Sequence, residues 1–371
     1  MKIASLLENI TKVRDKRRQY GNIRHKLKDV LVIGLVATLC GIKDFVGMEV
    51  FGRAKETWFA TFLELPNGIA DSETFRRIFE MVNPEELSEC LNSWLLSERE
   101  LTALKQVSVD GKTIRGSGND YHAAYHVVSA WAKEQGLTLG QVCVDEKSNE
   151  ITAIPQLLDM IDVSGAVVTI DAMGCQKKIA SKIISKKADY LLTLKANHKN
   201  MYKSAKELFE RIDCGDVEIC LDVHESRQNC HGRIETRIVD CAPANLIMAS
   251  SDWQNLETIV RVKYKSVCAK TGKETTITRY FLTSLPGNAR RLSLVIKNHW
   301  AIESGLHWAL DVIFQEDKSK AKKDNSPLNL NLLRKLALSI LIPHKQARIS
   351  FDKMMLRAAL DESYLHLVLF G

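Results

Sequence analysis

The chain has 371 residues, of which 45% are hydrophobic and 26% charged, and its formal net charge at pH 7 is +7. This balance is typical of a soluble globular protein with two or three domains. The longest apolar run, residues 30–42, is too short to cross a bilayer and suits a buried helix. The first ten residues lack the apolar core of a signal peptide, so we expect a cytoplasmic protein without a membrane partner.

One stretch near the N-terminus carries the excess positive charge. Residues 12–28 contain eight Lys and Arg side chains and one acid, Asp15, a balance of +7 that equals the formal charge of the whole chain. A basic segment on an otherwise neutral chain favours an anionic partner, and nucleic acid is the first candidate. A solvated helix face or a disordered arm would explain the pattern equally well. The candidates for contacts to a DNA backbone are Arg14, Lys16, Arg17 and Arg18.

Nine cysteines are spread singly through the chain, and no Cys-x-x-Cys pair occurs. The odd number and the scattered positions indicate reduced thiols. One group of thiols and imidazoles falls close together in the sequence: Cys214, Cys220, His224, Cys230, His231 and Cys241. Its spacings match no known zinc module, so we expect no zinc site.

The first hundred residues are predicted to be helical. The apolar residues 27–42 form one helix, and Asp71 offers an N-cap for a second helix over residues 73–80. Pro84 stands at a first-turn position of a third helix, which runs to residue 96. We therefore expect an all-helical domain over residues 1–97.

From residue 106 the pattern changes to short β-branched runs that alternate with helices. Strands are predicted at residues 106–110, 126–131, 137–144, 166–170 and 190–194, and helices at residues 150–161, 176–187 and 202–212. The closing strands alternate with helices, as a parallel βαβ layer requires.

The remaining chain completes a second domain over residues 104–371. A strand-rich block covers about residues 215–287, and a long helix follows over residues 289–314. We therefore predict an α/β fold with a mixed sheet, flanking helices and a β-rich insertion before the last long helix.

Two acids stand at the ends of predicted strands. Asp110 ends the first strand of the α/β part, and Asp171 ends the fourth. The carboxyl ends of parallel strands form the mouth of an open α/β sheet, where ligands bind. Taken singly, Asp110 could be an ordinary turn residue and Asp171 a helix cap.

A third acid, Glu303, lies on the predicted long helix. Ile296, Trp300, His307, Leu310 and Phe314 recur with it at steps of three and four, so we expect Glu303 within a buried, mostly apolar stripe. A buried carboxylate is costly unless it is paired or holds a metal, and no Lys or Arg lies on the stripe. Bonds from Glu303 to backbone groups are the alternative.

Three carboxylates around one cleft suit Mg²⁺, because hard divalent ions take oxygen ligands. Two such ions about 3.5–4 Å apart serve the attacking and leaving oxygens of phosphoryl transfer. Asp110, Asp171 and Glu303 together therefore indicate metal-dependent chemistry on a phosphodiester.

Six segments make the chain similar to DDE insertion-sequence transposases, most closely to the H-repeat-associated group. They are VDGKTIRGS (residues 109–117), DEKSNEITAIPQLL (145–158), TIDAMGCQKKIA (169–180), DYLLTLKANH (189–198), HGRIETR (231–237) and NHWAIESGLHWALDV (298–312). The segments run through most of the chain. The resemblance implies a ribonuclease H-like fold with a β-rich insertion between the second Asp and the Glu.

The resemblance also implies a function. It assigns Asp110, Asp171 and Glu303 as catalytic ligands of Mg²⁺ or Mn²⁺, with two ions expected. The implied reaction is cleavage of DNA at insertion-sequence ends and strand transfer into target DNA. The implied partners are double-stranded terminal repeats and target DNA, bound by a homodimer in the nucleoid-associated cytoplasm. Two alternatives remain: another ribonuclease H-like nuclease, such as a junction resolvase, and an inactive DNA-binding relic.

The chain departs from the family pattern around Glu303. Related transposases often carry Tyr and Arg before this Glu and Lys after it, and Ile296, His299 and Leu310 occupy these places here. Contacts to phosphates would then come from other residues. The candidates are Lys112, Arg115, Lys195, Arg233, Lys297 and His299. Solvated surface charge is the alternative for Lys112, Arg115 and Lys195, and an ordinary strand is the alternative for Arg233.

Overall fold

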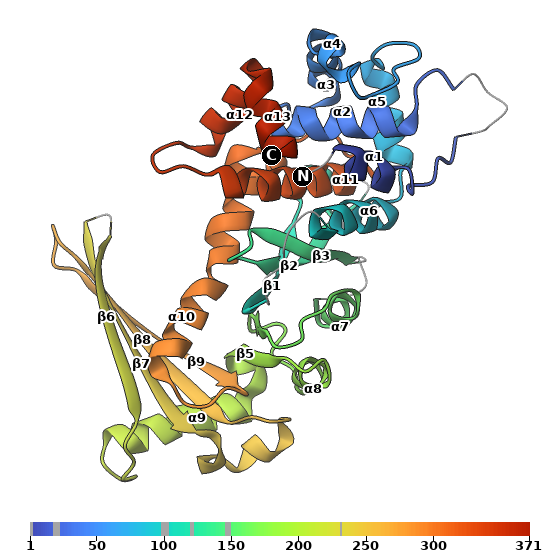
Figure 1. Ribbon diagram of the computed structural model, residues 1–371. Coiled ribbons are helices and arrows are strands. Elements are labelled where there is room, and N and C mark those ends of the chain that lie inside the picture. Colours follow the sequence, from blue (N-terminus) through green and yellow to red (C-terminus); the bar gives the residue numbers. More distant parts are fainter. Residues whose placement is uncertain (1–2, 18–22, 98–103, 119–121, 145–149, 231) are drawn as a thin grey trace. The chain divides into compact units, whose positions relative to one another are not determined.

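The computed structural model describes residues 3–17, 23–97, 104–118, 122–144, 150–230 and 232–371. The chain folds as an α/β protein whose described strands form one mixed sheet (Figure 1). The order of the nine strands in this sheet is β3-β2-β1-β4-β5-β9-β8-β7-β6. No helix in the described part of the chain is both long enough and apolar enough to cross a membrane.

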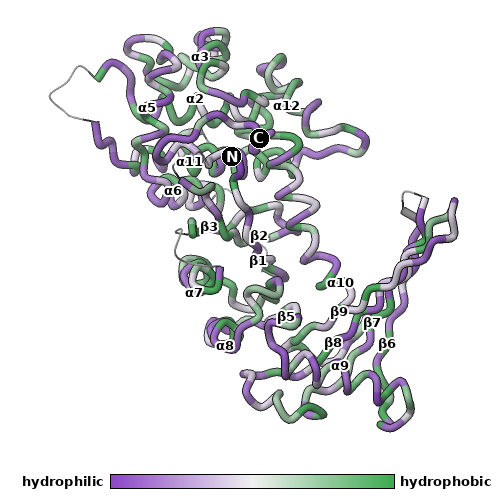
Figure 2. Tube along the Cα trace, turned by 180° about the vertical axis from the view of Figure 1, so that it is seen from behind, coloured by the Kyte–Doolittle hydropathy of each residue, from purple (hydrophilic) through white to green (hydrophobic). Residues whose placement is uncertain are grey.

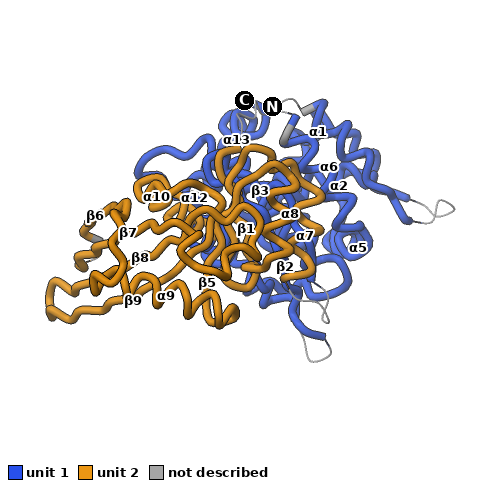
Figure 3. Tube along the Cα trace, turned by 90° about the horizontal axis from the view of Figure 1, so that it is seen from below, with its two compact units in different colours: residues 1–102, 111–147, 303–371 blue, residues 103–110, 148–302 orange. Residues whose placement is uncertain are grey.

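The described residues divide into two compact units, which Figure 3 colours separately. Unit 1 comprises residues 1–102, 111–147 and 303–371, and unit 2 comprises residues 103–110 and 148–302. The division passes through strand β1 (Gln106–Thr113), which gives its first five residues to unit 2 and its last three to unit 1.

Helices fill the N-terminal part of unit 1. They are α1 (Ile3–Ile10), α2 (Leu27–Leu39), α3 (Phe45–Ala54), α4 (Glu56–Phe59), α5 (Ser72–Met81) and α6 (Pro84–Ser97). Helix α2 is buried along almost its whole length, as its apolar sequence predicts, and Figure 2 shows this run as hydrophobic. The Asp71 carboxylate accepts a hydrogen bond from the Thr74 backbone N–H, which confirms the predicted N-cap of α5.

A hairpin and the C-terminal helices complete unit 1. They are β2 (His126–Ala132), β3 (Leu137–Val144), α11 (Ser326–Leu341), α12 (Phe351–Leu360) and α13 (Glu362–Phe370), with short 3₁₀ turns η1 (Arg115–Ser117), η7 (Glu316–Lys318) and η8 (Ile342–His344). Helix α11 is buried throughout. Its Asn329 side chain donates to the carbonyls of Phe79 and Val82, which ties α11 to the end of α5.

Unit 2 contains the parallel strands and the β-rich block. Its helices are α7 (Glu150–Met160), α8 (Lys177–Ser185), α9 (Lys199–Asp213) and α10 (Ala289–His299), with short turns η2 (Ala196–His198), η3 (Ala244–Leu246) and η4 (Met248–Asp252). Its strands besides β1 are β4 (Val167–Ile170), β5 (Asp189–Leu194), β6 (Asp222–Cys230), β7 (Arg233–Pro243), β8 (Thr258–Cys268) and β9 (Glu274–Thr283).

The strands of unit 2 change direction at β9. Strand β4 pairs in parallel with β1 and with β5, whereas β9 pairs antiparallel with β5 and begins the β9-β8-β7-β6 ladder. An apolar core joins this ladder to α10 through Val239, Val260, Phe281, Leu292 and Ile296. The predicted insertion is therefore a set of long antiparallel strands that extends the same sheet (Figure 1).

Two sequence predictions were wrong in detail. Strand β1 continues past Asp110 to Thr113, so Asp110 does not end the strand. The helix predicted over residues 289–314 is α-helical only to His299, and two π-helical segments follow at Ile302–His307 and Ala309–Ile313. The backbone N–H of Phe314 bonds to the Ala309 carbonyl five residues earlier, which is the π pattern.

Candidate active site

Two carboxylates occupy matching positions on neighbouring strands of unit 2. The parallel register between β1 and β4 runs from Gln106 opposite Val167 to Val109 opposite Ile170. Asp110 and Asp171 are the next residue on each chain. Because neighbouring strands lie about 4.8 Å apart, this register brings the two acids side by side at the carboxyl edge of β4.

Backbone N–H groups of the turn after β4 hold the side chain of Asp171. The Oδ1 atom of Asp171 accepts hydrogen bonds from the N–H groups of Met173 at 3.0 Å and Gly174 at 3.4 Å. A Cβ atom on Gly174 would lie 2.3 Å from Cγ2 of Ile170 and 2.7 Å from Cδ1 of Ile154. Only glycine therefore fits this tight turn, which fixes the Asp171 carboxylate in place.

The surroundings of Asp171 disfavour its negative charge. Burial raises the pKa of this carboxyl most, and the charge of Glu150 at the start of α7 raises it further. The two backbone N–H groups and the Lys195 ammonium lower the pKa, but by less. Sequence reasoning did not single out Glu150, although it is the first residue of the predicted helix over residues 150–161.

Buried polar side chains lie directly below the two acids. Oγ1 of Thr169 on β4 donates to Oγ of Ser108 on β1 at 3.1 Å and shares a 2.9 Å hydrogen bond with Nδ1 of His299 on α10. The Gln106 amide donates to the Val295 carbonyl of α10 at 2.9 Å. These bonds hold β1, β4 and α10 in a fixed register.

His299 therefore has a structural role in the core, whereas the sequence suggested a contact with a DNA phosphate. Its side chain is buried, and burial lowers the pKa of the imidazole to about 4. The ring is neutral at pH 7, and its Nδ1 atom is already bonded to Thr169.

Glu303 is exposed, so the predicted burial of this carboxylate was wrong. The π-helical turns that start at Ile302 change which residues share a face. Ile302, Leu306 and Leu310 are buried at steps of four, and Glu303 falls beside this row. An exposed carboxylate needs no buried partner, so burial does not indicate a metal at Glu303, and only the family pattern makes this residue a ligand.

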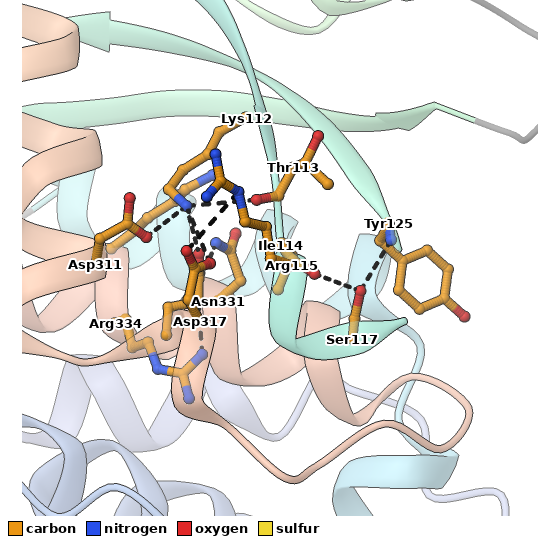
Figure 4. Close-up of polar contacts among 12 residues, drawn as sticks. Lys112, Thr113, Ile114, Arg115, Ser117, Tyr125, Asp311, Asp317, Asn331 and Arg334 are labelled. Atoms are coloured by element: carbon orange, nitrogen blue, oxygen red, sulfur yellow. Dashed lines mark hydrogen bonds and ion pairs between the residues drawn. The ribbon is translucent and has the colours of Figure 1, made fainter. Parts of the chain in front are cut away.

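Lys112 occupies the centre of an acidic cluster in unit 1 (Figure 4). Its Nζ atom lies 2.7 Å from Oδ1 of Asp311, 3.5 Å from Oε2 of Glu316 and 3.8 Å from Oδ1 of Asp317. The buried Glu316 carboxylate also accepts hydrogen bonds from Asn331 at 2.8 Å and Arg334 at 3.2 Å on α11. The cluster therefore fastens the π-helical segment and α11 to the end of β1.

This cluster makes Lys112 a poor candidate for a phosphate contact. The side chain is only 11% exposed, and three carboxylates surround its ammonium group. Arg115, three residues further on, is 80% exposed, and its Nε atom is 4.0 Å from Asp317.

The other predicted DNA contacts are scattered. Lys195 is exposed and acts electrostatically on Asp171, and Arg233 is exposed at the start of β7. In the basic segment Lys16 is exposed, whereas Arg14 pairs with Glu86 and Arg17 with Asp15, and Arg18 lies outside the described residues.

Within the described ranges, no three His, Cys, Asp or Glu side chains are gathered in a position to hold a metal ion. Of the suspected zinc group, Cys214 and Cys220 are exposed and Cys241 is buried. His231 lies outside the described residues.

Comparisons with known proteins give one consistent result. A family model described as "DDE_Tnp_1-associated" matches residues 7–95, and one described as "Transposase DDE domain" matches residues 103–340. The curated relative "H repeat-associated putative transposase YhhI" of Escherichia coli (strain K12) is 34% identical over 377 residues, which cover 100% of this chain and 99% of the relative. "Putative transposase YncI" of Escherichia coli O157:H7 is 34% identical over 374 residues, which cover 100% and 95%.

One solved structure, a piggyBac transposase synaptic complex with hairpin DNA, is similar with a TM-score of 0.43 and 9% sequence identity. The match covers 100% of this chain and 78% of that one. At this score the likeness carries no conclusion about the fold.

We predict that Asp171→Asn stabilises the metal-free protein at neutral pH. Because the folded state raises the pKa of Asp171 above its ordinary value of 3.8, stability falls as the pH rises from 3.8 through the raised pKa. Asparagine keeps an acceptor for the Met173 and Gly174 N–H groups and removes the charge. Urea unfolding in EDTA should show the gain at pH 7 and none near pH 3.8. A variant less stable than the wild type at pH 7 would contradict this reading.

We predict that Lys112→Met destabilises unit 1 by about 3–5 kcal/mol, because it leaves the buried Glu316 and its neighbours without this cation. Urea unfolding measures the change. Asp311→Asn should lower the free energy of unfolding by less in the Lys112→Met background than in the wild type, and the difference should be about 0.5–3 kcal/mol. Additive effects of the two substitutions would mean that the 2.7 Å contact contributes nothing.

Proposed function

This chain belongs to the DDE transposase family, and we propose that it cuts DNA at insertion-sequence ends and transfers the cut strands into target DNA. The proposal includes a ribonuclease H-like core built on β1, β4 and β5. The observation that carries it is the register that makes Asp110 and Asp171 neighbours at the edge of the parallel strands.

The residues at this edge fit a divalent cation. Asp110 and Asp171 offer carboxylate oxygens, which are the ligands that Mg²⁺ and Mn²⁺ prefer. Burial and the nearby charge of Glu150 raise the pKa of Asp171, and a bound cation would offset both effects. We propose Glu303 as the third ligand by the family's assignment. When bound, two such ions would activate the attacking oxygen and stabilise the leaving oxygen.

The other side chains of the site mainly position the two carboxylates and a phosphate of the DNA. The buried bonds among Ser108, Thr169 and His299 keep the two strands and α10 aligned, and so hold Asp110 and Asp171 in register. Lys195, exposed and close enough to act on Asp171, would bind a phosphate of the strand being cut.

The reaction has two displacements at phosphorus. Hydrolysis at the end of the element frees a 3′-hydroxyl, and this hydroxyl then attacks a target phosphodiester in line. We assign recognition of the terminal repeats to residues 1–97 and catalysis to residues 104–371. We further propose that a homodimer acts on DNA in the nucleoid-associated cytoplasm.

We predict that purified protein nicks and joins labelled DNA that carries this gene with its natural flanks, in Mg²⁺ or Mn²⁺ but not in EDTA. Asp110→Asn, Asp171→Asn and Glu303→Gln should each lower cleavage by several orders of magnitude, because in-line displacement depends on the bound ions. Each variant should still bind the DNA. Gel analysis of the labelled strands measures nicks and joined products separately.

Glu218→Gln is the matched control, since Glu218 is an exposed acid of the β-rich block and should retain full cleavage. Metal-dependent cutting of branched junctions without joined products would favour a resolvase. Tight DNA binding with no cleavage in either metal would favour an inactive relic.

A further inference from the structure

A groove opens on unit 1 between the starts of α3 and α5 and the loop that follows η7. Its volume is about 450 Å³, and its lining combines the 319–323 loop with residues of both helices. With Lys318, the last residue of η7, this segment has the sequence KSKAKK, and all four of its lysines are exposed. This segment did not stand out in the sequence, because acids on both sides balance its charge.

Three lysines of the groove have no carboxylate partner within the described residues: Lys43, Lys320 and Lys322. The acids that share the groove are already engaged. Glu73 pairs with Arg76 and Arg77, and Glu80 pairs with Arg76 and Lys323. Asp44 accepts the Gly47 N–H as the N-cap of α3. The unbalanced charge of the groove is therefore positive.

The loop that carries Lys320 and Lys322 is anchored at both ends. At its start, a Cβ atom on Gly116 would lie 2.9 Å from the Glu316 carbonyl oxygen and 3.0 Å from that of Ser319, so the backbones are in close contact. At its end, the Asn325 N–H donates to the Glu80 carbonyl at 3.3 Å. The lysines are thus held by an ordered backbone, which lowers the entropy lost when a ligand binds.

The basic segment of residues 12–28 differs from the groove because several of its cations pair with carboxylates. Within the described residues, four of its eight cations pair with acids: Arg14 with Glu86, Arg17 with Asp15, and Lys26 and Lys28 both with Glu64. The count of charges along the sequence points to this segment, whereas the groove brings close together in space three lysines without a carboxylate partner in the described part of the chain.

We propose that this groove binds the sugar-phosphate backbone of double-stranded DNA. The inference rests on the proposed function, which makes DNA the anionic partner. Ammonium groups contact phosphates without reading the base sequence, so the groove would position a duplex. The exposed Arg115 lies 4.0 Å from Asp317, just before the start of the loop.

The test compares two triple variants with the same change in net charge. Lys43→Gln, Lys320→Gln and Lys322→Gln together neutralise the groove. Lys203→Gln, Lys206→Gln and Lys265→Gln together neutralise exposed lysines that each pair with a glutamate. Fluorescence anisotropy with a random-sequence duplex, over a series of salt concentrations, gives the affinity and its salt dependence.

We expect the groove variant to lower the slope of log K against log salt by about 2–3, since each lost phosphate contact removes about 0.9. The control should change the slope by less than about 1. In the wild-type protein, the same duplex should slow acetylation of Lys43, Lys320 and Lys322 but not of Lys203 and Lys206.

An unchanged slope in the groove variant, an equal loss in both variants, or no duplex binding by the wild type would each overturn the proposal. A cleavage assay on the same preparations separates it from the proposed function. Wild-type protein that binds through the groove but cuts no DNA would refute the function alone, whereas cleavage with an unchanged slope would refute the groove alone.

Discussion

The parallel pairing of β1 with β4 determines where the chemistry of this protein can occur. The register fixes Val109 opposite Ile170, and the next residue on each chain is an aspartate. A shift of one residue along either strand would separate the two carboxylates and turn side chains to the opposite face of the sheet. The buried hydrogen bonds from Thr169 to Ser108 and His299 oppose such a shift, because breaking either bond would leave a buried polar group without a partner.

Strand β1 serves both compact units. Its first part carries Asp110, and Lys112, two residues further on, holds the acidic cluster of unit 1 together. The cluster joins β1 to the π-helical segment that follows Glu303 and to α11 through Glu316. The loop that carries Lys320 and Lys322 begins directly after this cluster.

Local patterns in the sequence predicted much of this fold. The strand at residues 137–144 and the helix that Asp71 caps depend on neighbouring residues, and both were placed well. The alternation of strands and helices predicted the parallel layer, and from it the neighbourhood of Asp110 and Asp171. Tertiary packing determined what the sequence did not predict. Glu303 is exposed because π-helical turns replace the α-helix, and periodicity at steps of three and four assumes an α-helix throughout.

Charge was the least predictable property. Lys112 looks like a surface cation in the sequence and lies among three carboxylates in the fold. Two of the acids that flank the 318–323 lysines in the sequence are engaged elsewhere, Glu316 by Arg334 and Asp317 by Lys112, whereas Asp324 pairs with Lys323. No sequence pattern marks Glu150 as a site residue. It affects the pKa of Asp171 only because α7 starts near that carboxyl. Such pairings join residues that are distant in the sequence, so composition alone cannot predict them.

If Asp110 and Asp171 jointly hold a divalent cation, as we propose, the position of the ion itself can be mapped. Fe²⁺ takes the place of Mg²⁺ at many oxygen-ligand sites, and with ascorbate and peroxide it cuts the protein backbone close to where it is bound. We expect fragments that end near residues 110 and 171, that excess Mg²⁺ suppresses, and that are absent in Asp171→Asn. Fragments only at other positions, such as the cysteines at 214 and 220, or none that Mg²⁺ suppresses, would contradict it.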